Sequence, residues 1–547
     1  MDSYCQRWCA GAPGAGLRIV GLGHHVLHDA NVGVVSPAGV EFAVSEERLS
    51  RHKQDGRFPR LALDFVGTQD ADVVVAPYFD AQGFEAAHRD PALRPRRDRF
   101  RETQRIREQA LRDVGVTEFV GHHFSHAAGA YYTGGFSEAL VVTYDAGIDC
   151  EPWFATVWRG MGATLTPLRR LTLHDGATAA LRYSGITAAL GYQPGRDEGK
   201  VTGLAACGRP DERCLDALNR AFLAFEAESP RRTYTGAAFA ARCAGILAEY
   251  SARDIAASLQ QMTEDTVTSL IAEFAPDPTK VNLVLAGGLF ANVLLNLRIK
   301  DMGFRSLYVY PAMGDEGLGL GAALASAVAR GIAPRALTHV FLGPGYDGDE
   351  VRRSLERTGL RFERCDDVEI VVARRLAEGH TVGRFAGRCE FGPRALGNRS
   401  ILYRADDRNV GAWLNRQLRR SDTMPFAPVT IDDLASELFE GLDGVERCTP
   451  FMTTAVRCTK RMHQSSPAVV HVDGTARVQI ASLATAPSLH RVISEYHSLT
   501  GMPCLLNTSF NVHGEPIVCS PDDAVRSFLA IGLDCLAIGD FLVERPR

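Results

Sequence analysis

The sequence predicts an α/β protein. Three short apolar runs, each ending in a turn that carries glycine or an acidic residue, are typical of buried strands: residues 17–22, 139–144 and 282–286. Helical stretches lie between these runs, and strands that alternate with helices favour sheets covered by helices. With 547 residues the chain is long enough for three or four folding units.

A histidine and an acidic residue, His28 and Asp29, follow the first apolar run. Because an unperturbed histidine titrates near neutral pH, His28 is a candidate general base. A hydrogen-bonded core histidine is the alternative, and the residues of this segment alone slightly favour that alternative.

Residues 121–130, GHHFSHAAGA, contain the clearest candidate for a metal site. His122 and His126 are four residues apart, so on a helix they share one face and can hold one cation. Asp145 ends the second apolar run, where a carboxylate faces the ligand crevice of an open α/β sheet. Two histidines and a carboxylate suit iron, zinc or manganese. Helical histidine pairs also occur by chance, so the spacing alone leaves the metal site open, and we expect His123 to be a packed or surface residue.

Two glycine-bearing turns, residues 145–147 and 286–288, follow apolar strands. Glycine lets the backbone approach a phosphate or a nucleoside, but a turn without a ligand is an equally good interpretation of each. Neither turn matches GxGxxG or a Walker A loop, which disfavours a Rossmann dinucleotide site and a P-loop. Asp315 stands at the head of a small-residue helix and can either cap that helix or bind a metal.

Pro and Gly cluster at residues 331–350, and we place the main domain boundary there, between residues 1–340 and 341–547. In the second part, arginines gather in turns shaped by glycine and proline. Arginine forks bind phosphate in bidentate fashion, although surface ion pairing is the alternative for each of them. The candidates are Arg388, Arg394, Arg399, Arg420 and Arg477, with the neighbouring polar turn Asn507, Thr508 and Ser509.

The composition is that of a globular protein, with 46% hydrophobic and 23% charged residues. Sixty basic and 65 acidic residues give a net charge of −5, so we expect no attraction to nucleic acid or to anionic membranes. The sequence contains no uninterrupted run of 18 apolar residues, so we expect no membrane span, and the N-terminus lacks the features of a signal peptide. The 13 scattered cysteines contain no CxxC pair and predict reduced thiols, so we expect a cytoplasmic protein.

A series of segments in order along most of the chain resembles the carbamoyltransferase family, which includes nodulation and antibiotic O-carbamoyltransferases such as the tobramycin enzyme. The segments are HDANVGVV, SEERLSRHKQDGRFP, HHFSHAAGA, EGKVTGLAACG, LAGGLFANVLLN, EFGPRALGNRSIL, LRRSDTMPFAPV, HVDGTARVQ and NTSFNVHGEPIV. Departures from the family pattern are modest. Asn31 replaces the serine of the HDAS block, and Ala146 stands where many members have glycine.

The resemblance implies two domains. Residues 1–340 would form a Kae1-like domain of the actin/Hsp70 (ASKHA) type, with two related lobes, and residues 341–547 a YrdC-like α/β domain that handles carbamoyl phosphate. The implied activity belongs to the transferases of one-carbon groups (EC 2.1.3 type). Carbamoyl phosphate and ATP would give a carbamoyl adenylate, whose carbamoyl group passes to a hydroxyl of a small secondary metabolite, a sugar or an antibiotic. The implied cofactors are ATP with Mg²⁺ and a divalent metal, iron being the expected one.

The resemblance also assigns residues. His28 would be the base that takes the proton of the acceptor hydroxyl. The implied metal ligands are His122, His126, Asp145 and Asp315. The implied nucleotide-binding residues are Gly147, Glu198, Lys200, Gly287, Gly288 and Asn292. The implied carbamoyl phosphate-binding residues are Arg394, Arg399, Arg420, Arg477, Asn507, Thr508 and Ser509.

Two alternatives come from other classes of protein. A tRNA threonylcarbamoyl transferase shares the metal site, but the net negative charge and the attached arginine-rich domain disfavour it. A non-catalytic nucleotide-binding regulator of the actin/Hsp70 type has no evident need of His28, four metal ligands and an arginine site together. We therefore expect a small hydroxylated acceptor and no nucleic-acid or membrane partner, and a homodimer is compatible with the sequence.

Overall fold

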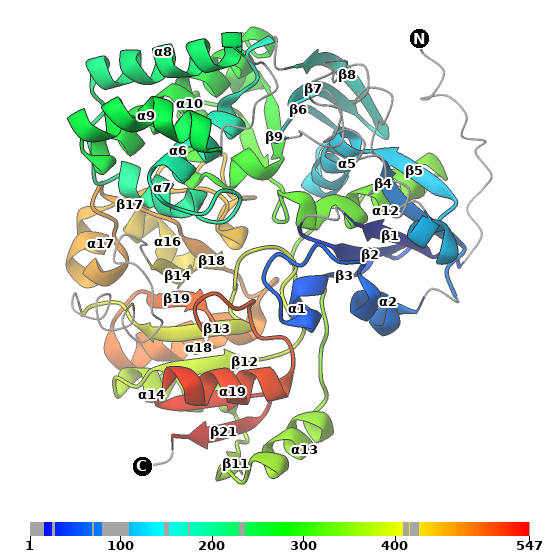
Figure 1. The fold of residues 1–547 in the computed structure, drawn as a ribbon. Helices are drawn as coiled ribbons and strands as arrows, with labels where there is room; N and C mark the ends of the chain where they lie inside the picture. The colour runs from blue at the N-terminus through cyan, green and yellow to red at the C-terminus, as the bar shows by residue number, and fades with distance from the viewer. Residues whose placement is uncertain are drawn as a thin grey trace. The chain divides into compact units, whose positions relative to one another are not determined.

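The computed structural model describes residues 16–24, 28–67, 70–78, 109–146, 153–172, 175–228, 236–407, 415 and 426–545. The predicted α/β class is confirmed, since helices and several sheets alternate along the chain (Figure 1). Contacts divide the chain into two compact units. Unit 1 contains residues 1–178, 277–290 and 307–337, and unit 2 contains residues 179–276, 291–306 and 338–547. The predicted division into residues 1–340 and 341–547 stays a prediction about domain families.

Unit 1 contains two five-stranded sheets with the same strand order. The first sheet runs β3-β2-β1-β4-β5 and the second β8-β7-β6-β9-β10. In each sheet the first three strands form an antiparallel meander, and the fourth strand pairs parallel with the first. The strands of the first sheet are β1 (Ile19–Gly23), β2 (Asn31–Ser36), β3 (Gly39–Ser45), β4 (Val73–Tyr78) and β5 (Glu118–Gly121). Those of the second are β6 (Glu138–Tyr144), β7 (Ala155–Met161), β8 (Thr164–Leu171), β9 (Asn282–Ala286) and β10 (Ser306–Val309). The three predicted strands are therefore confirmed as β1, β6 and β9.

Two helices of unit 1 are exchanged between these sheets. Helix α5 (His122–Gly134) follows the last strand of the first sheet but packs mainly on β6 and β9 of the second. Helix α12 (Leu318–Ala329) follows the last strand of the second sheet but packs on β1, β2 and β4 of the first. The two helices touch because Gly321 has no side chain; a Cβ there would lie 2.1 Å from the carbonyl oxygen of Ser125. The starts of both helices are thus held by elements of both sheets.

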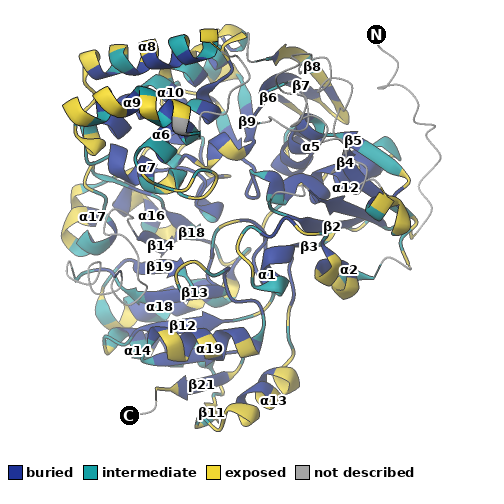
Figure 2. Ribbon diagram, in the orientation of Figure 1, coloured by how far each residue is buried: buried dark blue, intermediate teal, exposed yellow. Residues whose placement is uncertain are grey.

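The strands of both units consist largely of buried residues, drawn in dark blue in Figure 2, and most of these residues are apolar. In unit 1, valines and leucines of β1 and β2 pack with the short helix α2 (Arg60–Val66), which follows α1 (Glu46–Ser50). Among the described residues, no helix is both long enough and apolar enough to cross a membrane.

The first part of unit 2 is helical. Its helices are α6 (Ala179–Ala189), α7 (Glu198–Ala205), α8 (Glu212–Glu228), α9 (Ala237–Glu249), α10 (Ala252–Phe274) and α11 (Val293–Lys300). Short 3₁₀ turns occur in both units. Unit 1 contains η3 (Pro278–Lys280) and η5 (Asp315–Gly317), η4 (Gly288–Ala291) lies at a boundary along the chain, and unit 2 contains η6 (Thr449–Phe451) and η7 (Pro467–Val469). Helix α10 begins at a serine cap, because the side chain of Ser251 accepts a hydrogen bond from the N–H of Asp254.

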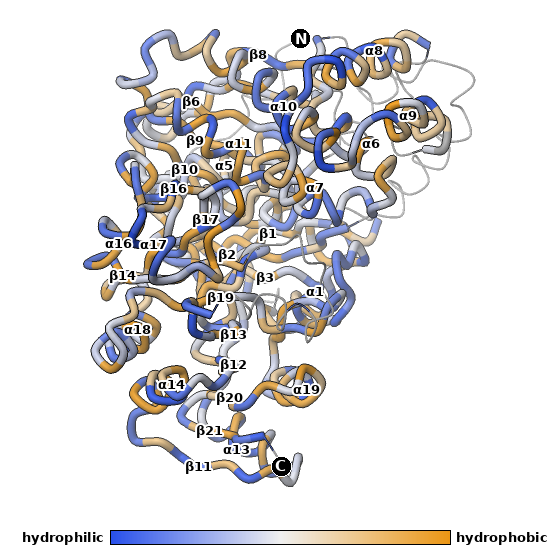
Figure 3. The backbone as a smooth tube through the Cα atoms, turned by 90° about the vertical axis from the view of Figure 1, so that its left-hand side faces the viewer, coloured by the Kyte–Doolittle hydropathy of each residue, from blue (hydrophilic) through white to orange (hydrophobic). Residues whose placement is uncertain are grey.

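The second part of unit 2 is built on an eight-stranded sheet of order β11-β21-β20-β12-β13-β19-β14-β18. Its strands are β11 (Phe362–Arg364), β12 (Val382–Phe385), β13 (Arg399–Arg404), β14 (Ala427–Ile431), β18 (Gln479–Ala481), β19 (Leu505–Ser509), β20 (Cys535–Ile538) and β21 (Phe541–Glu544). Helices α14 (Val368–Ala377) and α18 (Pro487–Thr500) cover one face, and α19 (Pro521–Ile531), which also contacts α13 (Gly348–Thr358), covers the other (Figure 3). A smaller sheet contains β15 (Phe439–Glu440), β16 (Val456–Cys458) and β17 (Thr475–Ala476), with α16 (Asp432–Leu438) and α17 (Lys460–Ser465) nearby.

Gly208 provides a test of packing in the helical part of unit 2. A Cβ at Gly208 would lie 2.1 Å from the carbonyl oxygen of Arg253, at the start of α10, so the backbone itself would have to move. We expect Gly208→Ala to lower the free energy of unfolding by about 1–3 kcal/mol, the usual cost of overpacking. The control is Gly245→Ala in α9, where a Cβ meets nothing within 4 Å. We expect this substitution to raise the free energy of unfolding by at most about 1 kcal/mol, because alanine has the higher helix propensity. Urea unfolding followed by circular dichroism measures both; equal stabilities of the two variants would contradict this account.

Candidate functional site

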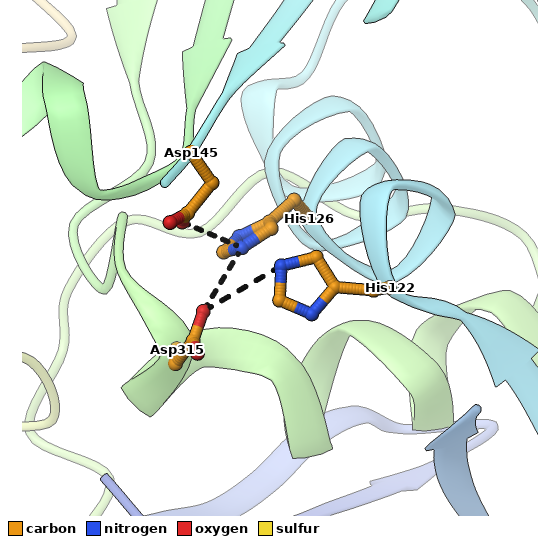
Figure 4. A group of neighbouring side chains, drawn as sticks. All are labelled: His122, His126, Asp145 and Asp315. Carbon is orange, nitrogen blue, oxygen red and sulfur yellow. Dashed lines mark ion pairs between the residues drawn. The ribbon is translucent and has the colours of Figure 1, made fainter. Parts of the chain in front are cut away.

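The four predicted metal ligands converge in unit 1 (Figure 4). His122 and His126 lie at the start of α5, one turn apart. Asp145 directly follows β6, and Asp315 begins the 3₁₀ turn that leads into α12. One ligand atom from each residue lies within 4.8 Å of every other, so four residues from three elements surround one point.

The charges in this cluster are strongly coupled. Nε2 of His126 lies 3.3 Å from a carboxylate oxygen of Asp145 and 3.3 Å from one of Asp315, and Nε2 of His122 lies 3.7 Å from Asp315. Burial lowers the pKa of His126, but its contacts with the two carboxylates outweigh burial and raise that pKa to about 9. Burial and the like charge of Asp315 raise the pKa of Asp145, whereas His126 lowers it, and the net pKa is below its ordinary range. The two carboxylates therefore favour a positive charge between them.

The chemistry of these side chains fits a transition metal. Two imidazole nitrogens and two carboxylate oxygens form a mixed donor set that iron, zinc and manganese accept. All four side chains are buried or nearly so, and Asp145, the most exposed, has only 16% of its side chain accessible. A cation held there would be shielded from solvent.

His123 belongs to the core instead. Its ring nitrogens lie 2.9 Å from the hydroxyl of Thr143 and 2.9 Å from the carbonyl oxygen of Trp153. Burial and the neighbouring His122 and His126 lower the pKa of His123 to about 3, so the ring is neutral. The expectation that His123 is a packed residue is confirmed.

His28 lies in the turn after β1, with 42% of its side chain exposed. Nδ1 of His28 lies 3.0 Å from a carboxylate oxygen of Asp29, a residue with a left-handed φ of 57°. Partial burial lowers the pKa of His28, but the hydrogen bond with Asp29 and the charges of Asp315 and Asp145 raise it to about 9. The field of the four-residue cluster thus reaches His28. The sequence interpretation missed Asp29 as the partner of this histidine, although the two are adjacent.

The second glycine turn is connected to the cluster. Gly287 has a φ of 103°, and a Cβ there would lie 2.1 Å from the carbonyl oxygen of Tyr144. The N–H of Gly288 donates to Oδ2 of Asp145 over 3.0 Å. This bond helps fix the carboxylate that the cluster uses. Gly147, the glycine predicted in the first turn, lies outside the described residues.

The other predicted nucleotide-binding residues lie in unit 2. Glu198, the first residue of α7, accepts hydrogen bonds from the Ser184 hydroxyl (2.9 Å) and the Gly195 N–H (2.6 Å). Lys200 forms an ion pair of 2.8 Å with Asp197. These contacts hold the start of α7 against the preceding loop.

Asn292 is the N-cap of α11, because its Oδ1 accepts from the N–H of Leu295. Its amide also pairs with Gln260 on α10, over 2.7 and 3.2 Å. The hydroxyl of Tyr183 contacts both Gln260 (3.1 Å) and Thr202 of α7 (2.8 Å), so this buried network joins α7 to Asn292. Sequence reasoning missed Tyr183 and Gln260, whose isolated positions carry no motif.

The topology of the eight-stranded sheet brings several of the predicted carbamoyl phosphate residues to one end of its central strands. The starts of β13 and β14 pair with the end of β19, through Ser400↔Ser509 and Ala427↔Asn507. Strand β18 runs parallel to β14 and begins near the same end, with the pair Val429↔Gln479. Arg477 lies just before β18 in the sequence. Segments from four parts of the chain therefore meet here, among them Asn507, Thr508 and Ser509 of β19. Arg420 lies outside the described residues.

The loop that carries Arg394 and Arg399 is held from inside by Glu390. One carboxylate oxygen of Glu390, which is 2% exposed, accepts from the N–H groups of Leu396, Asn398 and Arg399 over 2.8, 2.9 and 3.1 Å. The sequence contains this residue in EFGPRALGNRS, but its role depends on how the loop folds back. Glu390 therefore sets the conformation of the loop at this end of the strands.

The two arginines of this loop have different surroundings. Arg399 is fully buried; its guanidinium donates to the carbonyls of Ala386 (2.7 Å) and Gly387 (3.2 Å) and lies 3.5 Å from the ring centre of Phe385. Arg394 is only partly buried, and its guanidinium donates to the carbonyl oxygen of Ala291 over a long 3.4 Å. Arg399 thus stabilises the loop from within, while its predicted contact with carbamoyl phosphate stays a prediction.

Comparison with known families and proteins agrees with these motifs. Residues 96–324 match the family model described as Carbamoyltransferase N-terminus, and residues 373–545 match Carbamoyltransferase C-terminus. Among solved structures, HypF of T. kodakarensis is 14% identical with a TM-score of 0.32, covering 57% of this chain and 48% of that one, a similarity too low to assign a fold.

Nodulation proteins are similar over most of their length. Nodulation protein NolNO of Sinorhizobium fredii is 34% identical over 550 residues, covering 95% of this chain and 79% of the relative. Nodulation protein NolO of Bradyrhizobium diazoefficiens is 35% identical over 443 residues, covering 78% of this chain and 79% of the relative. The chain therefore belongs to the carbamoyltransferase family and is an enzyme of that family.

Proposed function

We propose that this protein is an ATP-dependent O-carbamoyltransferase that forms a carbamoyl adenylate and carbamoylates a hydroxyl of a small secondary metabolite, a sugar or an antibiotic. The observation that carries the proposal is the buried group His122, His126, Asp145 and Asp315, with His28 within its electrostatic field. In a carbamoyltransferase, this combination would supply a cation site and a base.

The proposed reaction has three balanced steps. Water cleaves carbamoyl phosphate to carbamate and phosphate. A carbamate oxygen attacks the α-phosphate of ATP, which gives carbamoyl adenylate and pyrophosphate. The acceptor hydroxyl then attacks the carbamoyl carbon, AMP leaves, and the hydroxyl proton passes to a base.

The metal proposal follows from the donor set. His122, His126, Asp145 and Asp315 would hold a divalent cation, with iron the expected one. When bound, that cation offsets negative charge on the phosphate of the leaving group. The residues themselves fix its place, because the Gly288 N–H holds Asp145 and the start of α5 holds both histidines.

His28 is the proposed base for the acceptor hydroxyl. A hydroxyl is a weak nucleophile, and an adjacent neutral imidazole can accept its proton as the bond to the carbamoyl carbon forms. The turn exposes part of the ring, so an acceptor can reach it. The Asp29 carboxylate, 3.0 Å from Nδ1, fixes the orientation of the ring.

Two further features support ATP and carbamoyl phosphate as co-substrates. The repeated strand order of the two sheets in unit 1 agrees with a fold of two related lobes, as in the actin/Hsp70 type. Arg477 just before β18 and the hydroxyls of Thr508 and Ser509 at the end of β19 would supply charged and neutral donors for a phosphate and a carbamoyl group, with Arg394 in the loop before β13.

The adenylation half-reaction tests the proposal without an acceptor. Protein loaded with Fe²⁺ under anaerobic conditions is incubated with ATP, Mg²⁺ and carbamoyl phosphate, and AMP and pyrophosphate are followed. We expect equimolar release of both that depends on carbamoyl phosphate. Release that is the same without carbamoyl phosphate, or no release from metal-loaded protein, would contradict the adenylate route.

Arg394→Ala tests the carbamoyl phosphate site in the same assay. A charge-assisted hydrogen bond contributes about 1.5–3 kcal/mol, so we expect the KM for carbamoyl phosphate to rise at least about tenfold with ATP binding unchanged. The control is Arg352→Ala, which removes an exposed arginine of α13 that pairs with Glu356. An unchanged KM in Arg394→Ala would place the anion elsewhere.

His126→Ala and Asp145→Asn test the metal site. Each removes one donor and changes the charge balance of the cluster, so we expect the Fe²⁺ content after loading and desalting to fall below about one tenth of the wild-type value. His123→Gln, on the same helix but outside the cluster, should retain the metal. Elemental analysis measures the content, and full loading of His126→Ala would refute the assignment.

The protonation of His28 should depend on the cluster. With a pKa of about 9, its imidazole is protonated at pH 7–8 unless the neighbouring negative charges are offset. We expect Asp29→Asn, or saturation with Zn²⁺, to lower the pKa toward the ordinary value of about 6.5. Titration of ¹³C-labelled histidine by NMR measures the change, with His28→Ala for assignment. The exposed Asp113→Asn is the control, and a pKa that stays near 9 in Asp29→Asn would exclude Asp29 as the cause.

A further inference from the structure

Asn31, the first residue of β2, is fully buried and makes three hydrogen bonds to backbone groups. Its Nδ2 donates to the carbonyl oxygens of Asp29 (2.8 Å) and Asp315 (2.9 Å). Its Oδ1 accepts from the N–H of Gly319 over 2.9 Å. Both amide protons and the amide oxygen are thus used.

These partners belong to the two halves of the proposed catalytic site. Asp29 holds the ring of His28 and has a left-handed backbone conformation that a non-glycine residue adopts only when its surroundings fix it. Asp315 belongs to the four-residue cluster, and Gly319 lies in the first turn of α12. One side chain therefore ties the turn with the base to the segment with the metal ligand.

Two glycines leave the space that this amide occupies, and a third lets strand β1 approach helix α12. A Cβ at Gly23 would lie 2.2 Å from Nδ2 of Asn31, and a Cβ at Gly319 would lie 2.6 Å from its Oδ1. A Cβ at Gly21 would lie 1.9 Å from the carbonyl oxygen of Gly319. Strand β1 and helix α12 therefore approach closely enough for a single amide to bridge them.

We propose that Asn31 is a positioning residue that fixes His28 and Asp315 relative to each other. The proposal rests on the proposed function, in which these two residues serve as base and metal ligand. Its three hydrogen bonds to described residues all go to backbone groups, so Asn31 acts through the residues it holds.

Asn31→Asp and Asn31→Ala change this bridge in different ways. Aspartate has the same shape but no proton to donate, so it would direct a negative charge at two carbonyl oxygens. Alanine has neither donor nor acceptor, so it removes all three bonds. The control is Asn282→Asp in unit 1, because Asn282 also begins a strand and donates to a backbone carbonyl, that of Glu138, over 3.0 Å.

The first measurement uses Co²⁺ as the probe, because its d–d absorption reports ligand geometry. We expect both Asn31 variants, checked for folding by circular dichroism, to bind Co²⁺ at least tenfold more weakly and with a shifted spectrum. Asn282→Asp should match the wild type. A folded Asn31→Ala or Asn31→Asp variant with unchanged affinity and spectrum would overturn the proposal.

The second measurement does not depend on metal. We expect Asn31→Ala to lower the pKa of His28 by at least about one unit in the metal-free protein, because the freed Asp29 no longer holds the imidazolium. Wild-type protein that binds no Co²⁺ would refute the metal site of the proposed function, and this pKa would then decide the role of Asn31. An unchanged His28 pKa in Asn31→Ala would overturn the proposed role of Asn31.

Discussion

The crossing of α5 and α12 is the contact on which the four-residue cluster depends. Each helix follows the last strand of one sheet of unit 1 and packs mainly on the other, so the helix starts are held from both sides. The crossing requires glycine at position 321, since a Cβ would lie 2.1 Å from the Ser125 carbonyl oxygen. A wider crossing would move His122 and His126 away from Asp315 together, and the cluster would lose its geometry as a whole.

Bringing two carboxylates together has an electrostatic cost that the surroundings must offset. Asp145 and Asp315 both lie 3.3 Å from His126, and these contacts raise the pKa of His126, which favours a positive charge on its ring. The N–H groups of Ala146 and Gly288 also donate to Asp145. A divalent cation brings more positive charge than one imidazolium and would relieve the same repulsion more completely. This relief of repulsion is the electrostatic argument for the cation site proposed above.

Local sequence patterns predicted the features of this protein that depend on local order. The apolar run at residues 17–22 corresponds to β1 (Ile19–Gly23), and the spacing of His122 and His126 placed both on one helix. Asn31 could not be found in this way, because its partners Asp315 and Gly319 are 284 and 288 residues distant. The identical strand order of the two sheets was hidden for the same reason, since it arises from pairings such as β6 with β9 that only the folded chain shows.

The arginines of unit 2 show a second limit of the sequence. Arg394 and Arg399 occur in one glycine-rich loop and carry the same signal for phosphate binding, yet a guanidinium can serve an anion only through N–H groups that point out of the fold. Those of Arg399 point at main-chain carbonyls and its plane covers Phe385, while Glu390 holds the loop backbone around it. The sequence shows that both arginines are present but not the direction in which their N–H groups point. In the proposed carbamoyl phosphate site, Arg399 would therefore act by stabilising the loop that carries Arg394. Arg394 would bind the anion with its guanidinium, and Arg399 would fix the loop conformation that orients Arg394.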